Sequence, residues 1–179
     1  MNKTLLSAAL IASFGFAAFA PSTARASDGT ITINGQVNAA TCTVAVTGTS
    51  GSTVTLPTVA TTVLGAAGNT AGQTAFSIGL TGCSSGVTKA ATYFEAGPNV
   101  NAAGRLNNSG LASNVNVQLV NSDGTTPIVI GSAAPSSGVG SFAVSGGTAT
   151  LNYFARYYAT GAAGPGDVAT SVTFSMVYN

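Results

Sequence analysis

Cys42 and Cys83 are the residues of this chain with the most distinctive chemistry, because the sequence holds two cysteines and no others. A metal site would need further ligands, and the sequence contains no histidine. An even cysteine count in the exported part of a protein instead predicts a disulfide. Closing the loop between positions 42 and 83 would stabilise the fold by about 4 kcal/mol in a chain-entropy model.

Few other side chains could take part in catalysis. Serine and threonine are plentiful, but a nucleophile needs a positioned base. Glu95 is an isolated acid, and Lys89 is the nominal candidate for a base. The sequence therefore argues against an enzyme, and no cofactor or metal site is expected.

Residues 1–26 have the features of a secretory signal peptide. Lys3 supplies the positive start, and an apolar run from Leu5 to Phe19 follows it. This run is too short for a membrane span. Ala24-Arg25-Ala26 is a small-x-small cleavage site, so we expect the mature chain to begin at Ser27, with cleavage after Ala24 as the alternative.

The composition indicates a folded, turn-rich protein. Hydrophobic residues make up 45% of the chain, charged residues make up 5%, and there are 23 glycines. Disordered chains have the opposite balance. The three basic residues after position 26 are scattered among four acidic ones, so no basic patch is available for nucleic acid.

Apolar residues alternate with polar ones in short runs along the chain, which predicts β-strands separated by turns. The pattern gives roughly seven or eight short strands and no convincing helix, as in a β-sandwich or barrel. A single helical turn is expected near Val63-Leu64. Expected strands cover 42–46, 53–56, 73–83, 88–96, 105–106, 114–120, 126–130, 139–144 and 148–159. The aromatic residues are expected to fill the core, and a ligand-binding stripe is the alternative.

Two further alternating stretches lie at opposite ends of the mature chain. In 168–179, one face carries Val172, Phe174, Met176 and Tyr178. No partner strand follows it in the sequence, and an uncovered apolar strand edge favours aggregation. Near the start, Ile31, Ile33, Gly35 and Val37 alternate with polar residues. We therefore predict that the first strand of one molecule completes the last strand of another.

Several motifs in one order resemble the chaperone–usher pilus subunits, specifically the major rod subunit of type 1 fimbriae. The resemblance covers essentially the whole mature chain. Its motifs are Gly35-Gln36-Val37-Asn38-Ala39-Ala40-Thr41-Cys42, Leu80-Thr81-Gly82-Cys83, Ser113 to Leu119, Phe154 to Gly161, and Gly166 with the penultimate Tyr178.

The resemblance implies an all-β, incomplete immunoglobulin-like sandwich that lacks its last strand and is completed by donor-strand complementation. Residues 27–41 would be the donor extension and 42–179 the pilin domain. Gly166 and the apolar face Val172, Phe174, Met176 and Tyr178 would form the acceptor groove and chaperone-docking strand.

The same resemblance implies the partners and the location of the protein. The expected partners are identical or related pilins, a periplasmic chaperone and an outer-membrane usher. The subunit would pass through the periplasm to a cell-surface fimbria that supports adhesion. A minor or adapter pilin is the first alternative, and a self-contained secreted binding module is the second.

Overall fold

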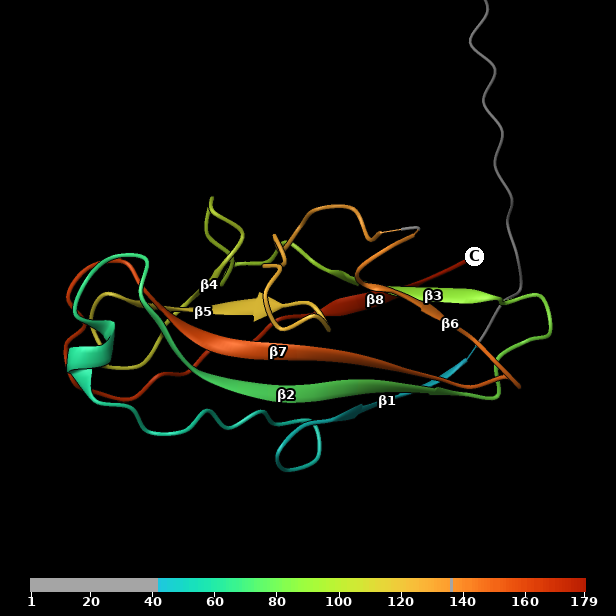
Figure 1. Ribbon diagram of the computed structural model, residues 1–179, viewed down its shortest axis with the longest axis horizontal. Coiled ribbons are helices and arrows are strands. Elements are labelled where there is room, and N and C mark those ends of the chain that lie inside the picture. The colour runs from blue at the N-terminus through green and yellow to red at the C-terminus, as the bar shows by residue number, and fades with distance from the viewer. Residues whose placement is uncertain (1–41, 136) are drawn as a thin grey trace, which may run out of the picture. The chain divides into compact units, whose positions relative to one another are not determined.

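The computed structural model describes residues 42–135 and 137–179, and in this part of the chain the secondary structure is almost entirely β (Figure 1). One sheet has five strands in the order β1-β2-β7-β5-β4, and the other has three in the order β6-β3-β8. The larger sheet contains β1 (Thr43–Thr47), β2 (Thr70–Thr81), β7 (Ala149–Ala159), β5 (Val115–Val120) and β4 (Leu106–Asn107). The smaller contains β6 (Ser141–Ala143), β3 (Lys89–Phe94) and β8 (Phe174–Tyr178). A 3-10 helix, η1, covers Thr61–Leu64, as the sequence predicts.

Every pairing between these strands is antiparallel. The longest is between β2 and β7, which pair from Thr70↔Tyr158 to Leu80↔Ala149 with a bulge between Ala71 and Thr74. In the smaller sheet β3 pairs with β6 on one side and with β8 on the other. The strand β8 is therefore an edge strand of its sheet.

The two sheets enclose one main core, so the all-β fold class expected from the sequence is confirmed. Tyr153 of β7 is its largest fully buried side chain. Its ring contacts those of Phe76, Phe94 and Phe142 at centroid distances of 5.3–5.7 Å. Its hydroxyl donates to Thr92 Oγ1 at 3.0 Å, which satisfies the polar end of an otherwise apolar residue.

Three expected strands differ from the structure. Segments 53–56 and 126–130 form single bridges, Ser50↔Thr53 and Val120↔Pro127, rather than strands. Proline has no amide donor for a ladder, and Pro57 and Pro127 lie in or directly after these segments. The last strand is also shorter than the predicted 168–179, because its ladder partner β3 ends at Phe94.

A smaller apolar cluster lies at the η1 end of the body, opposite the start of β1 (Figure 1). It is built from Leu64, Ala112, Val115 and Ala159. The strand β2 runs from this end to Thr81, two residues before Cys83. In the described part of the chain, no helix is long and apolar enough to span a membrane.

Candidate functional site

An apolar groove of about 750 Å³ opens between two extended segments of the described chain, residues 52–56 and 168–174. Strands of the larger sheet provide most of its floor through inward-facing side chains. These include Phe76, Ile78, Val117, Leu119, Ala155 and Tyr157. Ala155 lies between the larger Tyr153 and Tyr157 on the same face of β7, and it contributes a small side chain to the floor.

Both walls of the groove have main-chain groups without ladder partners. Among the described residues, neither 54–57 nor 170–172 makes a backbone–backbone hydrogen bond. The hydroxyl of Thr170 lines the groove and is buried without a partner. The Thr55 amide donates to Thr49 Oγ1 at 2.7 Å, and Ser171 O accepts from Asn99 Nδ2 at 3.2 Å. An extended segment placed between the walls could supply hydrogen bonds to the remaining main-chain groups and cover the apolar floor.

The wall at 166–169 is fixed to the loop 108–112 by the side chain of Asn108. Its Nδ2 donates to the carbonyl oxygens of Ala112 at 2.9 Å and Asp167 at 3.3 Å. Its Oδ1 accepts from the amides of Gly110 and Ala169, both at 2.8 Å. The Ser109 and Ala112 amides also donate to Ala169 O at 2.9 Å and Asp167 O at 3.0 Å, so the Asn108 side chain and these backbone bonds together fix the wall at the η1 end of the groove.

Two glycines allow the close approach of these segments. A Cβ at Gly166 would lie 2.5 Å from the carbonyl carbon of Leu111, and one at Gly110 would lie 2.2 Å from the carbonyl oxygen of Asp167. Gly166 also has a φ of 146°, which side chains rarely permit. We name the arrangement of Asn108, Gly110 and Gly166 the Asn108 clamp.

The family model for the type-1 fimbrial protein, A, matches residues 56–179, which include most of the groove. This chain belongs to the type-1 fimbrial protein family. It is 45% identical to the major fimbrial subunit SMF-1 of Stenotrophomonas maltophilia, over 90% of this chain and 99% of that protein. It is 42% identical to the F17 fimbrial protein of Escherichia coli, over 90% of this chain and 93% of that protein.

The solved structure of the P pilus rod subunit PapA has the same fold, with a TM-score of 0.55 at 18% identity. The match covers 84% of this chain and 100% of that one. The fold is therefore an immunoglobulin-like pilin fold, and the protein is a structural subunit of a surface fimbria rather than an enzyme. The family, function and extracellular location predicted from the sequence are confirmed, and so is partnership with other pilins.

The pilin's predicted acceptor residues occupy different parts of this region. Val172 and Phe174 line the groove. Met176 and Tyr178 lie further along β8, half-buried against the main core, and Gly166 belongs to the Asn108 clamp. The predicted donor residues Ile31, Ile33, Gly35 and Val37 lie outside the described residues.

Sequence reasoning missed two parts of this site. It did not identify Asn108, although Asn107-Asn108-Ser109-Gly110 has the composition of a tight turn. It also placed the groove along the last strand alone and overlooked the wall at 52–56. That wall faces the groove because of the path the chain takes after β1, which no local pattern encodes.

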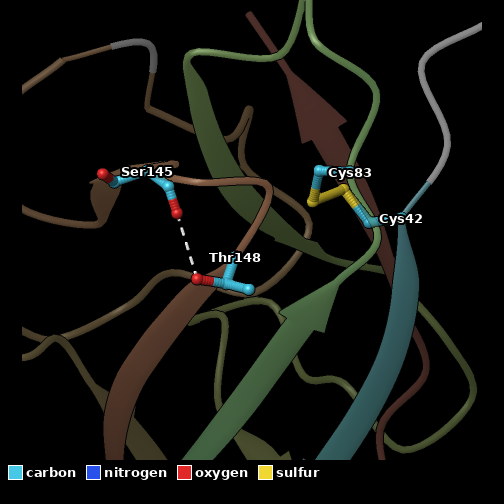
Figure 2. Close-up of a disulfide and its surroundings, with 4 residues drawn as sticks. All are labelled: Cys42, Cys83, Ser145 and Thr148. Atoms are coloured by element: carbon cyan, nitrogen blue, oxygen red, sulfur yellow. Dashed lines mark hydrogen bonds between the residues drawn. A yellow bond between two sulfur atoms is a disulfide. The ribbon is translucent and has the colours of Figure 1, made fainter.

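A disulfide joins Cys42 to Cys83 at the opposite end of the body from η1, with an S–S distance of 2.05 Å. Figure 2 shows it beside the turn Ser145–Thr148, in which Thr148 Oγ1 donates to Ser145 O at 3.0 Å. The amide of Cys83 donates to Gly147 O. The bond fixes the start of β1, and thus the strand that leads into the 52–56 wall.

The end of β8 also reaches this disulfide. Burial raises the pKa of the Tyr178 phenol, and a hydrogen bond with the backbone of Cys42 acts in the opposite direction. The amides of Thr88 and Lys89 both donate to Asn179 O at 2.8 Å. The segment 168–178 therefore runs from the η1 end of the body to the disulfide end.

None of the described residues that line the groove has a charged side chain, so a charge inserted among them would be buried without a partner. The nearby Glu95 carboxylate is exposed and accepts a hydrogen bond from Ser175 Oγ. That bond, together with one from Thr173, lowers the pKa of Glu95. In the described part of the chain no cluster of three or more potential metal ligands occurs.

Proposed function

We propose that this fimbrial subunit polymerises by donor-strand exchange, in which residues 27–41 of one copy insert into the groove of the next. The observation that supports this most directly is the groove itself. Its floor is apolar, its walls are extended, and its wall residues 54–57 and 170–172 make no backbone–backbone hydrogen bond with another described residue. A β-strand inserted into the groove would give the walls main-chain hydrogen bonds and would cover the apolar floor with its side chains.

The extension has the alternation that such a strand needs. Ile31, Ile33 and Val37 share one face, and burying each contributes roughly 1.5–3 kcal/mol. Each main-chain hydrogen bond to a wall adds about 0.5–1.5 kcal/mol net. Ordering the extension offsets part of this gain, but the balance favours a joint that dissociates very slowly. Gly35 would occupy a shallow part of the groove, where a side chain would clash.

Assembly by this route requires the groove to be covered before polymerisation. After cleavage of the signal peptide 1–26, a periplasmic chaperone would lend a strand beside β8. An outer-membrane usher would then exchange it for the extension of the next subunit. The assembled fimbria would support cell adhesion.

The test compares two substitutions on opposite faces of the donor strand. Ile33→Asp places a charge in the apolar groove and should abolish fibre formation. The body of the mutant should still fold and bind chaperone, because donor-strand exchange would place Ile33 in the next subunit's groove and not in its own core. The measurements are fibre yield and the amount of periplasmic chaperone–subunit complex.

Thr32→Asp is the matched control, because successive side chains of a strand point to opposite faces. It should form fibres far better than Ile33→Asp. An equal loss of fibres in both variants would contradict the donor-strand proposal, as would loss of the chaperone complex in Ile33→Asp.

A further inference from the structure

We infer that Thr170 sets the register of the inserted strand, because its buried hydroxyl finds a hydrogen-bond partner only opposite Gly35 of the extension. The inference rests on the proposed donor-strand exchange and deepens it. Thr170 is the position in the groove wall that distinguishes the correct alignment of the extension from alignments shifted along the groove.

Thr170 interrupts an apolar row on the inward face of the wall. Val168, Thr170 and Val172 are half-buried, whereas Ala169 and Ser171 between them are exposed. Val168 and Val172 pack against the main core, and all three half-buried residues line the groove. Threonine has nearly the shape of valine but carries a hydroxyl, so this position places one polar group in an apolar row.

The Thr170 hydroxyl has no partner within the described part of the chain. Its Oγ1 is buried and makes no hydrogen bond there. Thr170 Oγ1 and Arg105 Nε are the two buried side-chain atoms of this kind among the described residues, and of these two residues only Thr170 lines the groove. A buried hydroxyl destabilises any state that leaves it unpaired, so an inserted strand that pairs it is favoured.

The main chain around Thr170 is positioned to receive a strand on the groove side. Carbonyl oxygens of alternate residues accept hydrogen bonds from groups of the body, and these are the carbonyls of Asp167, Ala169, Ser171 and Thr173. Main-chain groups of consecutive residues in an extended segment point to opposite sides, so those of Val168, Thr170 and Val172 point toward the groove. A strand that bonds to them lies directly beside Thr170.

The alternation within the extension does not by itself define one register. A shift by one residue would turn Ile31, Ile33 and Val37 away from the floor. A shift by two residues keeps every side chain on its own face and still buries apolar side chains. An additional contact is therefore needed to exclude shifts by two residues.

Gly35 opposite Thr170 provides this contact. Directly opposed side chains in a sheet have Cβ atoms about 4.5–5.5 Å apart, so Ile33 or Val37 at this place would cover the hydroxyl with apolar atoms. Gly35 has no side chain and leaves the main chain of the inserted strand open to the hydroxyl. The hydroxyl is then paired in one register and unpaired in both neighbouring ones, and a desolvated polar group gives specificity in this way.

The experiment uses the full mature chain, from Ser27 to Asn179, and synthetic peptides of residues 27–41 that carry different fluorophores. The measured quantity is the ratio in which the protein captures the wild-type peptide and a Gly35→Ala peptide, offered together in equal amounts. Thr170→Val removes the hydroxyl and keeps the branched shape, whereas Thr170→Ser keeps the hydroxyl. Thr150→Val is the matched control, because Thr150 is exposed on β7 and does not line the groove.

The wild type should prefer the wild-type peptide by roughly tenfold or more, because a methyl group at position 35 would cover the Thr170 hydroxyl. In Thr170→Val this preference should fall by roughly fivefold or more, whereas Thr170→Ser and Thr150→Val should retain it. A clash of the methyl group with the branched side chain is common to threonine and valine, so it cancels in the comparison.

A second peptide tests the assigned register. An Ile33→Ala peptide should bind more weakly than the wild-type peptide, and by the same factor in the wild-type protein and in Thr170→Val. The factor is the same because Ile33 would not lie opposite position 170, and residues without a shared contact act independently.

The outcomes separate this inference from the proposed function. Failure of the wild type to capture the wild-type peptide would contradict donor-strand exchange itself. Normal capture with the same preference in the wild type and in Thr170→Val would overturn the role of Thr170 alone. The same conclusion would follow if Thr150→Val lost the preference equally, or if Thr170→Ser behaved like Thr170→Val. Coupling of Thr170 to Ile33 as strong as its coupling to Gly35 would overturn the assigned register.

Discussion

Asn108, Gly110 and Gly166 act at the scale of single residues by fixing the position of a main-chain segment. Among the described residues no strand lies beside the segment 166–169 on the groove side, and its position depends on the Asn108 clamp together with the backbone bonds from the Ser109 and Ala112 amides to Ala169 O and Asp167 O. A hydrogen bond of this kind contributes about 1 kcal/mol net, but an unpaired buried group costs more. The glycines matter because the segments approach within the space that a Cβ would occupy.

Replacing Gly166 by alanine should destabilise the body. The new Cβ would lie 2.5 Å from Leu111 C and the backbone would be held at a φ of 146°, so we expect a loss of about 1–3 kcal/mol. The measurement is the urea midpoint of the full mature chain. Gly97→Ala is the control, because a Cβ there meets no atom within 4 Å. Equal midpoints for the two variants would show that the close approach at Gly166 has no energetic consequence.

At the scale of elements, the two edges of β8 differ in their pairing. One side forms a ladder with β3 from Ala90↔Tyr178 to Phe94↔Phe174. The other side is an edge that continues into the groove wall at 168–173. An exposed edge of this kind can pair with another strand, so under the proposed donor-strand exchange the element that would permit polymerisation is also the one most prone to aggregation.

Phe174→Asp should prevent the subunit from accumulating in the periplasm. Phe174 lines the groove and lies 6.4 Å from the Phe94 ring, so a carboxylate there would be buried without a partner at a cost of several kcal/mol. The measurement is the periplasmic level of soluble subunit. Val177→Asp is the control, because Val177 is 37% exposed on the opposite face of β8. A wild-type level of Phe174→Asp would refute the assignment of Phe174 to the groove.

At the scale of the whole molecule, the body is a sandwich left open along one side and closed at one end by a disulfide. Cys42 and Cys83 precede β1 and follow β2, which pair directly from Thr43↔Thr81. The bond therefore ties β1, an edge strand of the larger sheet, to its neighbour β2 at one end of the body. A disulfide stabilises the folded state mainly because it reduces the conformational entropy of the unfolded chain.

Substituting both cysteines by serine should lower the free energy of unfolding by about 4 kcal/mol. Chemical denaturation of the double variant and the wild type measures this difference. Intact-mass analysis of unreduced periplasmic protein should give a mass two hydrogens below that of the dithiol. Two free thiols in the wild type, or equal stability of the two proteins, would contradict this role.

The sequence by itself determined the class of fold, the elements that carry the core and the family. These properties follow from local patterns, because a period of two assigns alternate residues of a strand to opposite faces. Leu151, Tyr153 and Ala155 could therefore be assigned to one face of β7 before their partners were known. The cysteine pair and the edge strand at the end of the chain could be predicted on similar local grounds.

Only the tertiary structure decided where the groove lies and how it is held open. Segment 53–56 alternates like a strand, yet it forms a wall because its path leaves it without a neighbouring strand. Residues 168–172 belong to the strand expected over 168–179, but the ladder between β3 and β8 ends at Phe94↔Phe174. The Asn108 clamp joins residues 59 positions apart. Contacts of that range depend on how whole elements pack, and no periodicity within a single segment encodes them.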